Sequence, residues 1–89
     1  MNILIIKLGA KGDVIRTLPI AKALKENYKN SNITWITKSN AAELISNSPF
    51  IDKTYVLPFQ TDEQFDMLYN FDIEEEATHL AKEIKASKK

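Results

Sequence analysis

The stretch NILIIKLGAKGDVIRTLP, residues 2–19, decides how this chain folds. Its first part, NILIIK at residues 2–7, is apolar on both faces, and such a run is typical of a central parallel strand covered by helices on each side. The only two glycines of the chain follow, Gly9 and Gly12, where about six would be usual for this length. Asp13 comes directly after them. This order predicts a strand, a glycine-bearing loop and a helix in immediate succession.

Outward from this stretch, the pattern predicts alternating strands and helices. Apolar residues recur at helical spacing from Asp13 to about Asn27. Pro19 lies inside that pattern and cannot donate a hydrogen bond to the carbonyl of Ile15, so the helix is expected either to kink there or to begin near Thr17. Further strands are predicted at residues 33–38, 53–57 and 65–71, and further helices at residues 39–45 and 73–84.

The order of these elements indicates an α/β fold with an open, mainly parallel sheet of about four strands and flanking helices. One connection is short for such a fold, because only seven residues lie between Leu57 and Phe65, whereas a parallel crossover usually takes a dozen or more. Either the fourth strand starts later, or the crossover is an extended segment without a helix. Ser39 is expected to cap the second helix, and Asp72 with Glu75 has the spacing of a capping box.

Composition excludes several classes of function. The formal net charge is zero, with twelve basic and twelve acidic residues, which argues against a nucleic-acid binder that is basic on one face. The chain has no cysteine, so disulfides and thiolate metal sites are excluded, and the single histidine, His79, has no second histidine with which to share a metal. The longest apolar run, Ile3 to Ile6, is far shorter than the ~20 residues of a membrane span, and no signal-peptide pattern opens the chain. A single domain over residues 1–89 and a cytoplasmic location are the expectations.

The glycine-bearing loop is the natural place for function, because ligands of parallel α/β sheets bind beyond the carboxyl ends of the strands. The spacing Gly9-x-x-Gly12 matches neither the dinucleotide fingerprint nor a phosphate-binding P-loop. On spacing alone, a ligand site and a tight structural turn both remain open. Asp13 likewise has two candidate roles, as the N-cap of the helix or as a carboxylate that serves as a general base.

The segment ILIIKLGAKGDVIRTLPIAKALKENYKNSNITWIT, residues 3–37, resembles the amino terminus of glycosyltransferase family 9, the heptosyltransferases that build the inner core of lipopolysaccharide. The shared pattern is an apolar strand, a short loop, Gly12-Asp13, Thr17 and Pro19, a helix, and a strand with aromatic and apolar residues. NSPFIDKTYVLP and FDMLYNFDIEEEATHLAKEIKASKK resemble the family's next segments in the same order, so the likeness covers nearly the whole chain.

This resemblance implies the GT-B architecture, in which two Rossmann-like domains face a cleft, with residues 1–89 as part of the first, acceptor-side domain. Members of the family transfer heptose from ADP-heptose to a lipid-linked sugar with inversion at the anomeric carbon, and no cofactor or metal is expected beside the donor. The family's Gly-Asp aspartate, which is taken as the catalytic base, corresponds to Asp13. Contacts to the acceptor are expected from the loop and the start of the helix: Gly9, Lys11, Gly12, Arg16 and Thr17.

The chain departs from the family pattern in two respects. The connection at residues 58–64 is short, and the sequence stops at Lys89, where relatives continue into a second domain that holds the donor. Alone, these residues are therefore expected not to transfer sugar. The alternative is a stand-alone module that binds an anionic sugar or phosphate without chemistry. Peripheral membrane association and self-association through an exposed sheet edge both remain open.

Several other side chains have a functional and a structural interpretation. Lys7, Lys11 and Arg16 flank the loop and either meet an anionic acceptor or are ordinary solvated residues. Thr17 either hydrogen-bonds the acceptor or caps the helix after a kink. Trp35 is expected in the core, and His79, four residues after Glu75 on the last helix, is expected to form a surface pair with that glutamate.

Overall fold

The computed structural model describes residues 1–8, 11–57, 61, 63–72 and 75–88. Its elements in chain order are β1 (Asn2–Ile6), α1 (Lys11–Asn27), β2 (Asn32–Thr37), α2 (Ser39–Ser46), β3 (Lys53–Val56), β4 (Phe65–Asn70), α3 (Glu75–Glu83) and β5 (Ala86–Lys88). The strands form one sheet in the order β3-β2-β1-β4-β5, and every neighbouring pair is parallel. The predicted α/β class and open parallel sheet are confirmed.

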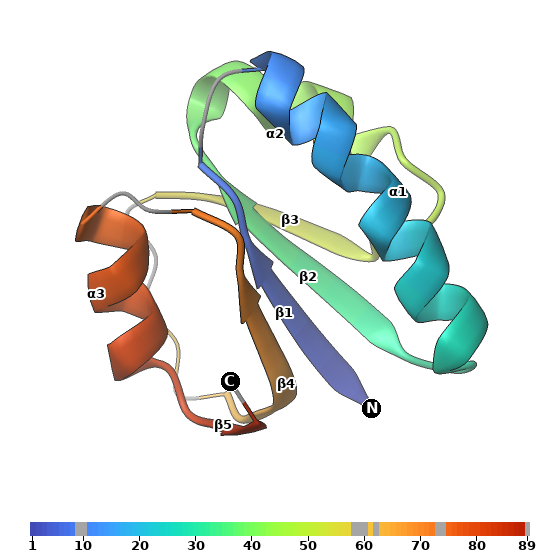
Figure 1. Ribbon diagram of the computed structural model, residues 1–89, viewed down its shortest axis with the longest axis vertical. Coiled ribbons are helices and arrows are strands. Elements are labelled where there is room, and N and C mark those ends of the chain that lie inside the picture. Colours follow the sequence, from blue (N-terminus) through green and yellow to red (C-terminus); the bar gives the residue numbers. More distant parts are fainter. Residues whose placement is uncertain (9–10, 58–60, 62, 73–74, 89) are drawn as a thin grey trace.

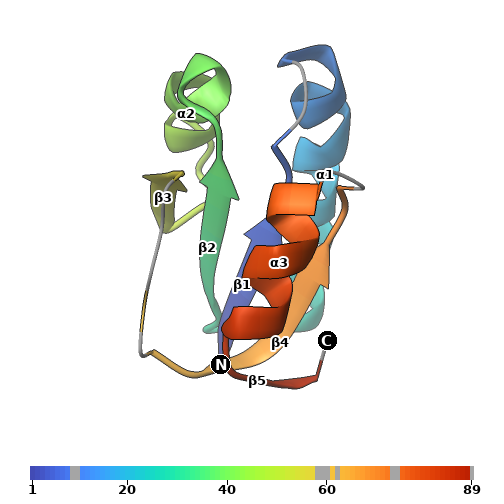
Figure 2. The ribbon, with the colours of Figure 1, turned by 90° about the vertical axis from the view of Figure 1, so that its left-hand side faces the viewer.

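Helices cover the sheet on both faces, with α1 and α2 on one side and α3 on the other (Figures 1 and 2). The central strand β1 supplies side chains to both layers. Ile3 and Ile5 belong to the core that includes α1 and α2, while Leu4 and Ile6 belong to the core that includes α3. All four are completely buried. This burial on two sides explains the continuous apolar run near the start of the sequence.

The strand order places a switch point between β1 and β4. From β1 the chain continues into α1 on one face of the sheet, and from β4 it continues into α3 on the opposite face (Figure 2). In open α/β sheets, ligands bind outside the carboxyl ends of the strands at such a point. The switch point therefore coincides with the segment that the sequence marks as a candidate site.

The sequence pattern does not predict the fifth strand. After α3 the chain turns back beside β4, where the Phe65 N–H donates to the carbonyl of Lys85 and β5 pairs with Phe65 and Met67. The strand consists of alanine, serine and lysine, which have little preference for strands, and three residues are too few to show a period. β5 therefore depends on pairing with β4 rather than on its own sequence.

Helix α1 continues through Pro19, so the expectation that it begins near Thr17 is wrong. Pro19 and Ile15 both lie on the exposed side of the helix. Water can therefore satisfy the carbonyl of Ile15, which Pro19 leaves without its helical donor. This exposure allows the helix to tolerate the proline, and α1 begins at Lys11.

Two expectations about the middle of the chain are also settled. The N-cap position of α2 is occupied by Lys38, whose backbone is still extended and whose side chain makes no capping hydrogen bond, so Ser39 is not the cap. β4 begins at Phe65 as predicted, which rules out a later start. Residues 57, 61, 63 and 64 of the connection are not helical, and its other residues lie outside the described part of the chain.

Asp52 ties the turn before β3 to α1 and β2. Its Oδ2 accepts hydrogen bonds from Lys25 Nζ and from the Ile33 N–H, each at 2.7 Å. Partial burial raises the pKa of this carboxyl, but the Lys25 hydrogen bond, the Ile33 N–H and the Lys25 charge together hold the pKa below its ordinary value of 3.8. A pKa that is lowered by folding contributes stability above the unfolded-state pKa, and this contribution is lost as the pH falls through the folded-state pKa.

We expect Asp52→Asn to lower the free energy of unfolding at about pH 6, by no more than about 1 kcal/mol because the pair is partly exposed. The difference from the wild type should shrink as the pH falls below about 4, where the carboxylate becomes protonated. Urea unfolding of both proteins across this range measures the effect. Lys25→Met should reduce the same pH dependence, and identical pH profiles for all three proteins would show that the pair does not contribute.

Candidate functional site

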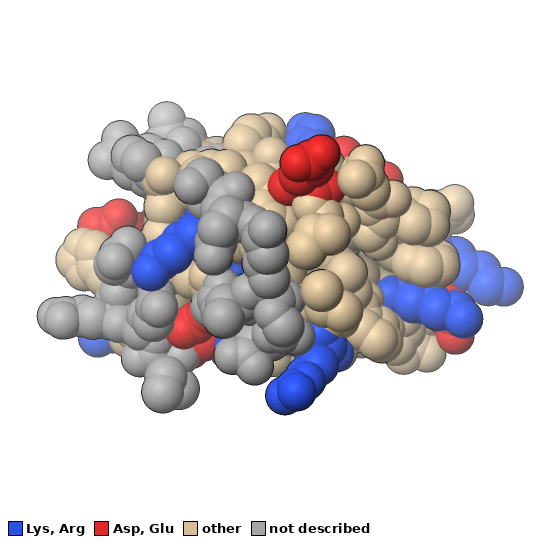
Figure 3. Space-filling model, turned by 90° about the horizontal axis from the view of Figure 1, so that it is seen from above, with Lys and Arg blue, Asp and Glu red and all other residues tan. Residues whose placement is uncertain are grey.

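The carboxyl ends of β1, β2 and β4 lie at one end of the molecule, which is the end that Figure 3 shows. Acidic and basic side chains are interspersed on the described part of this face, and neither sign dominates it. The charge of the described part of this face therefore does not select a ligand. The properties of the site follow from individual contacts instead.

The segment after β4 holds the end of β1 in place. The Leu8 N–H donates to Asp72 Oδ2 at 2.8 Å, and Lys7 Nζ donates to the carbonyl of Phe71 at 3.0 Å. Lys7 Nζ also lies 3.9 Å from Asp72 Oδ2, where the two side chains are 18% and 5% exposed, respectively. A buried carboxylate that accepts a backbone N–H beside an ammonium group is compensated for its lost hydration. The contact is therefore a stable link between the two strand ends.

The backbone around Lys7 is fixed from both neighbouring strands. The Lys7 N–H donates to the carbonyl of Ile36 at 3.2 Å, and the Lys7 carbonyl accepts from Trp35 Nε1 at 3.4 Å. The Phe71 N–H donates to the carbonyl of Ile6 at 3.0 Å. Trp35 is completely buried, which confirms its predicted place in the core. The chain thus leaves β1 from a well-supported position.

The predicted catalytic aspartate belongs to the first turn of α1. The helix begins at Lys11, so Asp13 is its third residue and the expectation that it is the N-cap is wrong. Gly12 is helical as well. The side chains of Lys11 and Asp13, and all of Gly9, lie outside the described part of the chain.

The other basic and polar candidates occupy different environments. Arg16 is exposed and Thr17 is buried, and both interact with other groups of the protein. Thr17 lies well inside α1, so it does not cap the helix. Lys7 Nζ donates to the Phe71 carbonyl and lies close to Asp72, so Lys7 is not an ordinary solvated lysine. The structure brings Arg16 and Thr17 onto the turn that follows Asp13 and gives Lys7 a structural role.

His79 forms a surface pair with Glu83, one turn further along α3. The side chain of Glu75, the partner expected from the sequence, lies outside the described part of the chain. His79 Nε2 lies 2.9 Å from Glu83 Oε1, and both side chains are exposed. Among the described residues, no group of three histidine or acidic side chains could hold a metal ion. None of the helices in the described ranges has the length and apolar character needed to cross a membrane.

Two polar residues at the strand ends are not predicted from the sequence. The sequence predicts Asp72 as the first member of a capping box with Glu75, which is wrong, because α3 begins at Glu75 and Asp72 Oδ2 accepts from the Leu8 N–H instead. Thr37, the last residue of β2, is completely buried, and its Oγ1 has no hydrogen-bond partner among the described residues. Unpaired buried hydroxyls are uncommon in native proteins. Polar side chains at the carboxyl ends of the strands are therefore not confined to the glycine-bearing loop.

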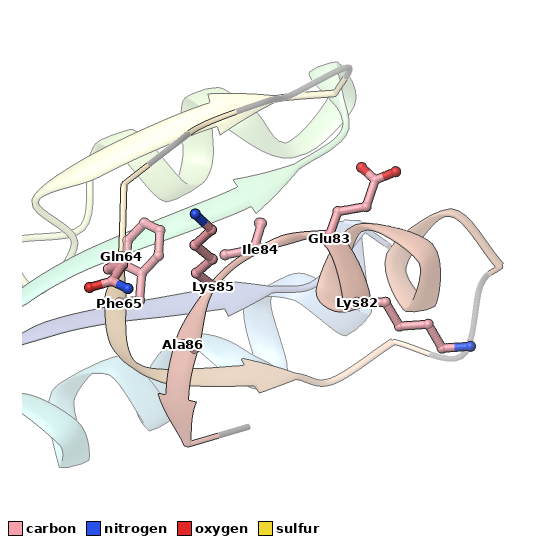
Figure 4. A pocket seen from close by; sticks show the side chains of 7 residues that line it. All are labelled: Gln64, Phe65, Lys82, Glu83, Ile84, Lys85 and Ala86. Atoms are coloured by element: carbon pink, nitrogen blue, oxygen red, sulfur yellow. The ribbon is translucent and has the colours of Figure 1, made fainter.

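A hollow at the opposite end of β4 is a weaker candidate. It has a volume of about 330 Å³ and is lined by Gln64, Phe65, Lys82, Glu83, Ile84, Lys85 and Ala86. Figure 4 shows the Lys82 and Glu83 side chains pointing away from Phe65, so the charged groups do not converge. The hollow also lies at the amino-terminal end of β4, away from the edge at which ligands of such sheets bind.

Comparison with known proteins agrees with the resemblance seen in the sequence, although no family model matches the chain. "Lipopolysaccharide heptosyltransferase 1" of Campylobacter coli is 35% identical over 60 residues, which are 67% of this chain and 18% of that protein. The crystal structure of the glycosyl transferase family 9 from Veillonella parvula matches with a TM-score of 0.84 and 22% identity, over 96% of this chain and 29% of that one. E. coli heptosyltransferase WaaC with ADP matches with a TM-score of 0.82 and 17% identity, over 99% of this chain and 33% of that one.

The chain spans 18% of the length of its curated relative and 29% and 33% of the two solved structures. The structural matches show that the fold is the Rossmann-like one of these glycosyltransferases. The sequence match extends over two thirds of the chain. Sequence and fold together confirm the predicted resemblance, and the chain belongs to glycosyltransferase family 9, where it corresponds to the N-terminal part of the heptosyltransferases.

Proposed function

We propose that this chain is the acceptor-side part of an inverting glycosyltransferase that transfers heptose from ADP-heptose to an inner-core acceptor of lipopolysaccharide. The observation that carries the proposal is the position of Gly12-Asp13 in the first turn of α1, directly after the central strand and beside the switch point of the sheet. In this proposal residues 1–89 form part of the first of two Rossmann-like domains of a cytoplasmic enzyme.

Asp13 is the general base in the proposed reaction. An acceptor hydroxyl attacks the anomeric carbon of the heptose, the bond from that carbon to ADP breaks, and the hydroxyl proton passes to the Asp13 carboxylate. The hydroxyl approaches from the side opposite to ADP, so a single displacement inverts the configuration. No covalent enzyme intermediate is needed. The positive end of the α1 dipole favours a negative charge on Asp13 before the reaction.

The same turn of α1 and the next one supply the proposed acceptor contacts: Gly9, Lys11, Gly12, Arg16 and Thr17. The Arg16 guanidinium is exposed, and its planar fork suits the carboxylate or phosphate groups of an anionic acceptor. The free N–H groups at the start of a helix also bind such groups. A second domain of the complete protein would hold the donor, so the 89 residues alone are expected not to transfer heptose.

Separate titrations of the isotope-labelled chain with an inner-core acceptor sugar and with ADP test this assignment. The acceptor should shift the amide resonances of Leu8, Val14 and Thr17, and ADP should leave them unchanged. Lys53, at the amino-terminal end of the edge strand β3, is the internal reference and should not respond to either ligand. Shifts with ADP and none with the acceptor would contradict an acceptor-side role. Acceptor binding without transfer by the protein of the complete reading frame would instead support a non-catalytic binding module.

A further inference from the structure

Two aspartates from the β4 region accept backbone hydrogen bonds from opposite ends of the β1 region. Asp66 Oδ2 accepts from the Asn2 N–H at 2.7 Å, and Asp72 Oδ2 accepts from the Leu8 N–H at 2.8 Å. The bond at Asn2 is exposed, whereas the Asp72 side chain is 5% exposed and has Lys7 Nζ beside it. The two contacts have the same chemistry, but only the second lies next to the segment that leads to Asp13.

We propose that Asp72 is a positioning residue of the transferase site, which fixes the start of α1, and with it Asp13, through its hydrogen bond to Leu8. This inference rests on the proposed function. Asp72 acts through the backbone of Leu8 and is not assigned any contact with the acceptor or the reacting atoms.

Leu8 is the point from which the position of α1 is set. Its N–H is held by Asp72, and its side chain is completely buried in the core that includes α3. Only two residues separate Leu8 from Lys11, the first residue of α1, and α1 lies on the opposite face of the sheet. Because α1 begins so soon after Leu8, we expect loss of the Asp72 bond to displace both Leu8 and the first turn of the helix.

Lys7 and Phe71 make the link rigid. The Lys7 ammonium group donates to the Phe71 carbonyl and lies near Asp72. The residues that precede Leu8 and Asp72 in the chain are therefore also joined. The Phe71 N–H also donates to the carbonyl of Ile6. Such support matters for catalysis, because a displacement of about 1 Å in a catalytic group can lower the rate about 10²-fold.

The test compares variants of the protein encoded by the complete reading frame. Asp72→Ala should lower kcat for heptose transfer about 10²-fold while the KM for ADP-heptose stays within about twofold, because the proposed function places the donor on a second domain. Asp72→Asn keeps an oxygen that can accept from Leu8 and should restore most of kcat. Should Asp72→Ala fail to fold, Asp72→Leu replaces it, since leucine has a similar shape and no acceptor.

Asp66→Ala is the matched control, because it removes the same kind of bond at the other end of β1, and its kcat should equal that of the wild type. A folded Asp72→Ala enzyme with wild-type kcat would overturn the positioning role, and so would an Asp72→Asn enzyme as slow as Asp72→Ala. A wild-type protein without heptose transfer would instead refute the proposed function, and the positioning role with it. The two failures are distinguishable because the first requires an active wild type.

Discussion

Replacing Asp13 by asparagine is expected to lower heptose transfer by about 10²–10⁴-fold in the protein of the complete reading frame, because an amide cannot accept the proton of the acceptor hydroxyl. The KM for ADP-heptose should change little, since Asp13 lies on the acceptor side in the proposed function. The fold should persist, because Asp13 is not the N-cap of α1 and the lost interaction with the helix dipole is worth only about 0.3–1 kcal/mol. ADP release measures the rate, and circular dichroism checks the fold.

Glu26→Gln is the control for this experiment. Glu26 is an exposed carboxylate near the other end of the same helix, and the substitution makes the same change from acid to amide. It should leave the rate of transfer unchanged. A folded Asp13→Asn enzyme that retains the wild-type rate would show that another group takes the proton.

The second large effect concerns stability and follows from the two-sided burial of β1. Ile5 is completely buried and pairs with Trp35 on β2 and with Tyr69 on β4. Truncation of a buried isoleucine to alanine typically costs about 2–5 kcal/mol, partly through the cavity that remains. Small domains have a total free energy of unfolding of only about 5–15 kcal/mol. Ile5→Ala is therefore expected to lose a large share of the stability of the 89-residue chain.

Urea unfolding followed by the fluorescence of Trp35 measures this loss, because Trp35 is the only tryptophan and is completely buried. Ile15→Ala is the matched control, since Ile15 is 50% exposed on α1. Its cost should stay below about 1 kcal/mol, as for most substitutions on the surface. Equal losses for the two variants would mean that β1 is not the centre of the core.

The parts of the fold that the sequence predicts are those with a strong local pattern. The apolar run of β1 predicts a central parallel strand, and the helical stripe around Ala77 and Leu80 predicts α3. β5 cannot be predicted in this way, because its three residues have no preference of their own and pair only when β4 is in place. The local sequence also does not predict that α1 continues through Pro19, because this depends on the exposure of Ile15 in the folded protein.

The candidate site likewise has one part that the local sequence predicts and one part that it does not. The Gly12-Asp13 pair follows the apolar strand directly, so local sequence is sufficient to mark it, and its family resemblance gives it a role. Asp72 lies 64 residues from Leu8 in the chain, and only the pairing of β1 with β4 brings the two together. A local pattern therefore identifies the residue proposed to accept the proton, whereas the contact proposed to position it follows only from the folded structure.

The most direct measurement of the central claim is transfer from ADP-heptose to a lipid-linked inner-core acceptor by the protein of the complete reading frame, with the wild type and Asp13→Asn assayed side by side. The proposed function predicts that the wild type releases ADP and forms a heptosylated product with inverted anomeric configuration, and that Asp13→Asn forms at least about 10²-fold less of it. A wild type that forms no product, or a variant that forms as much product as the wild type, would contradict the assignment of this turn of α1 as the catalytic acceptor site.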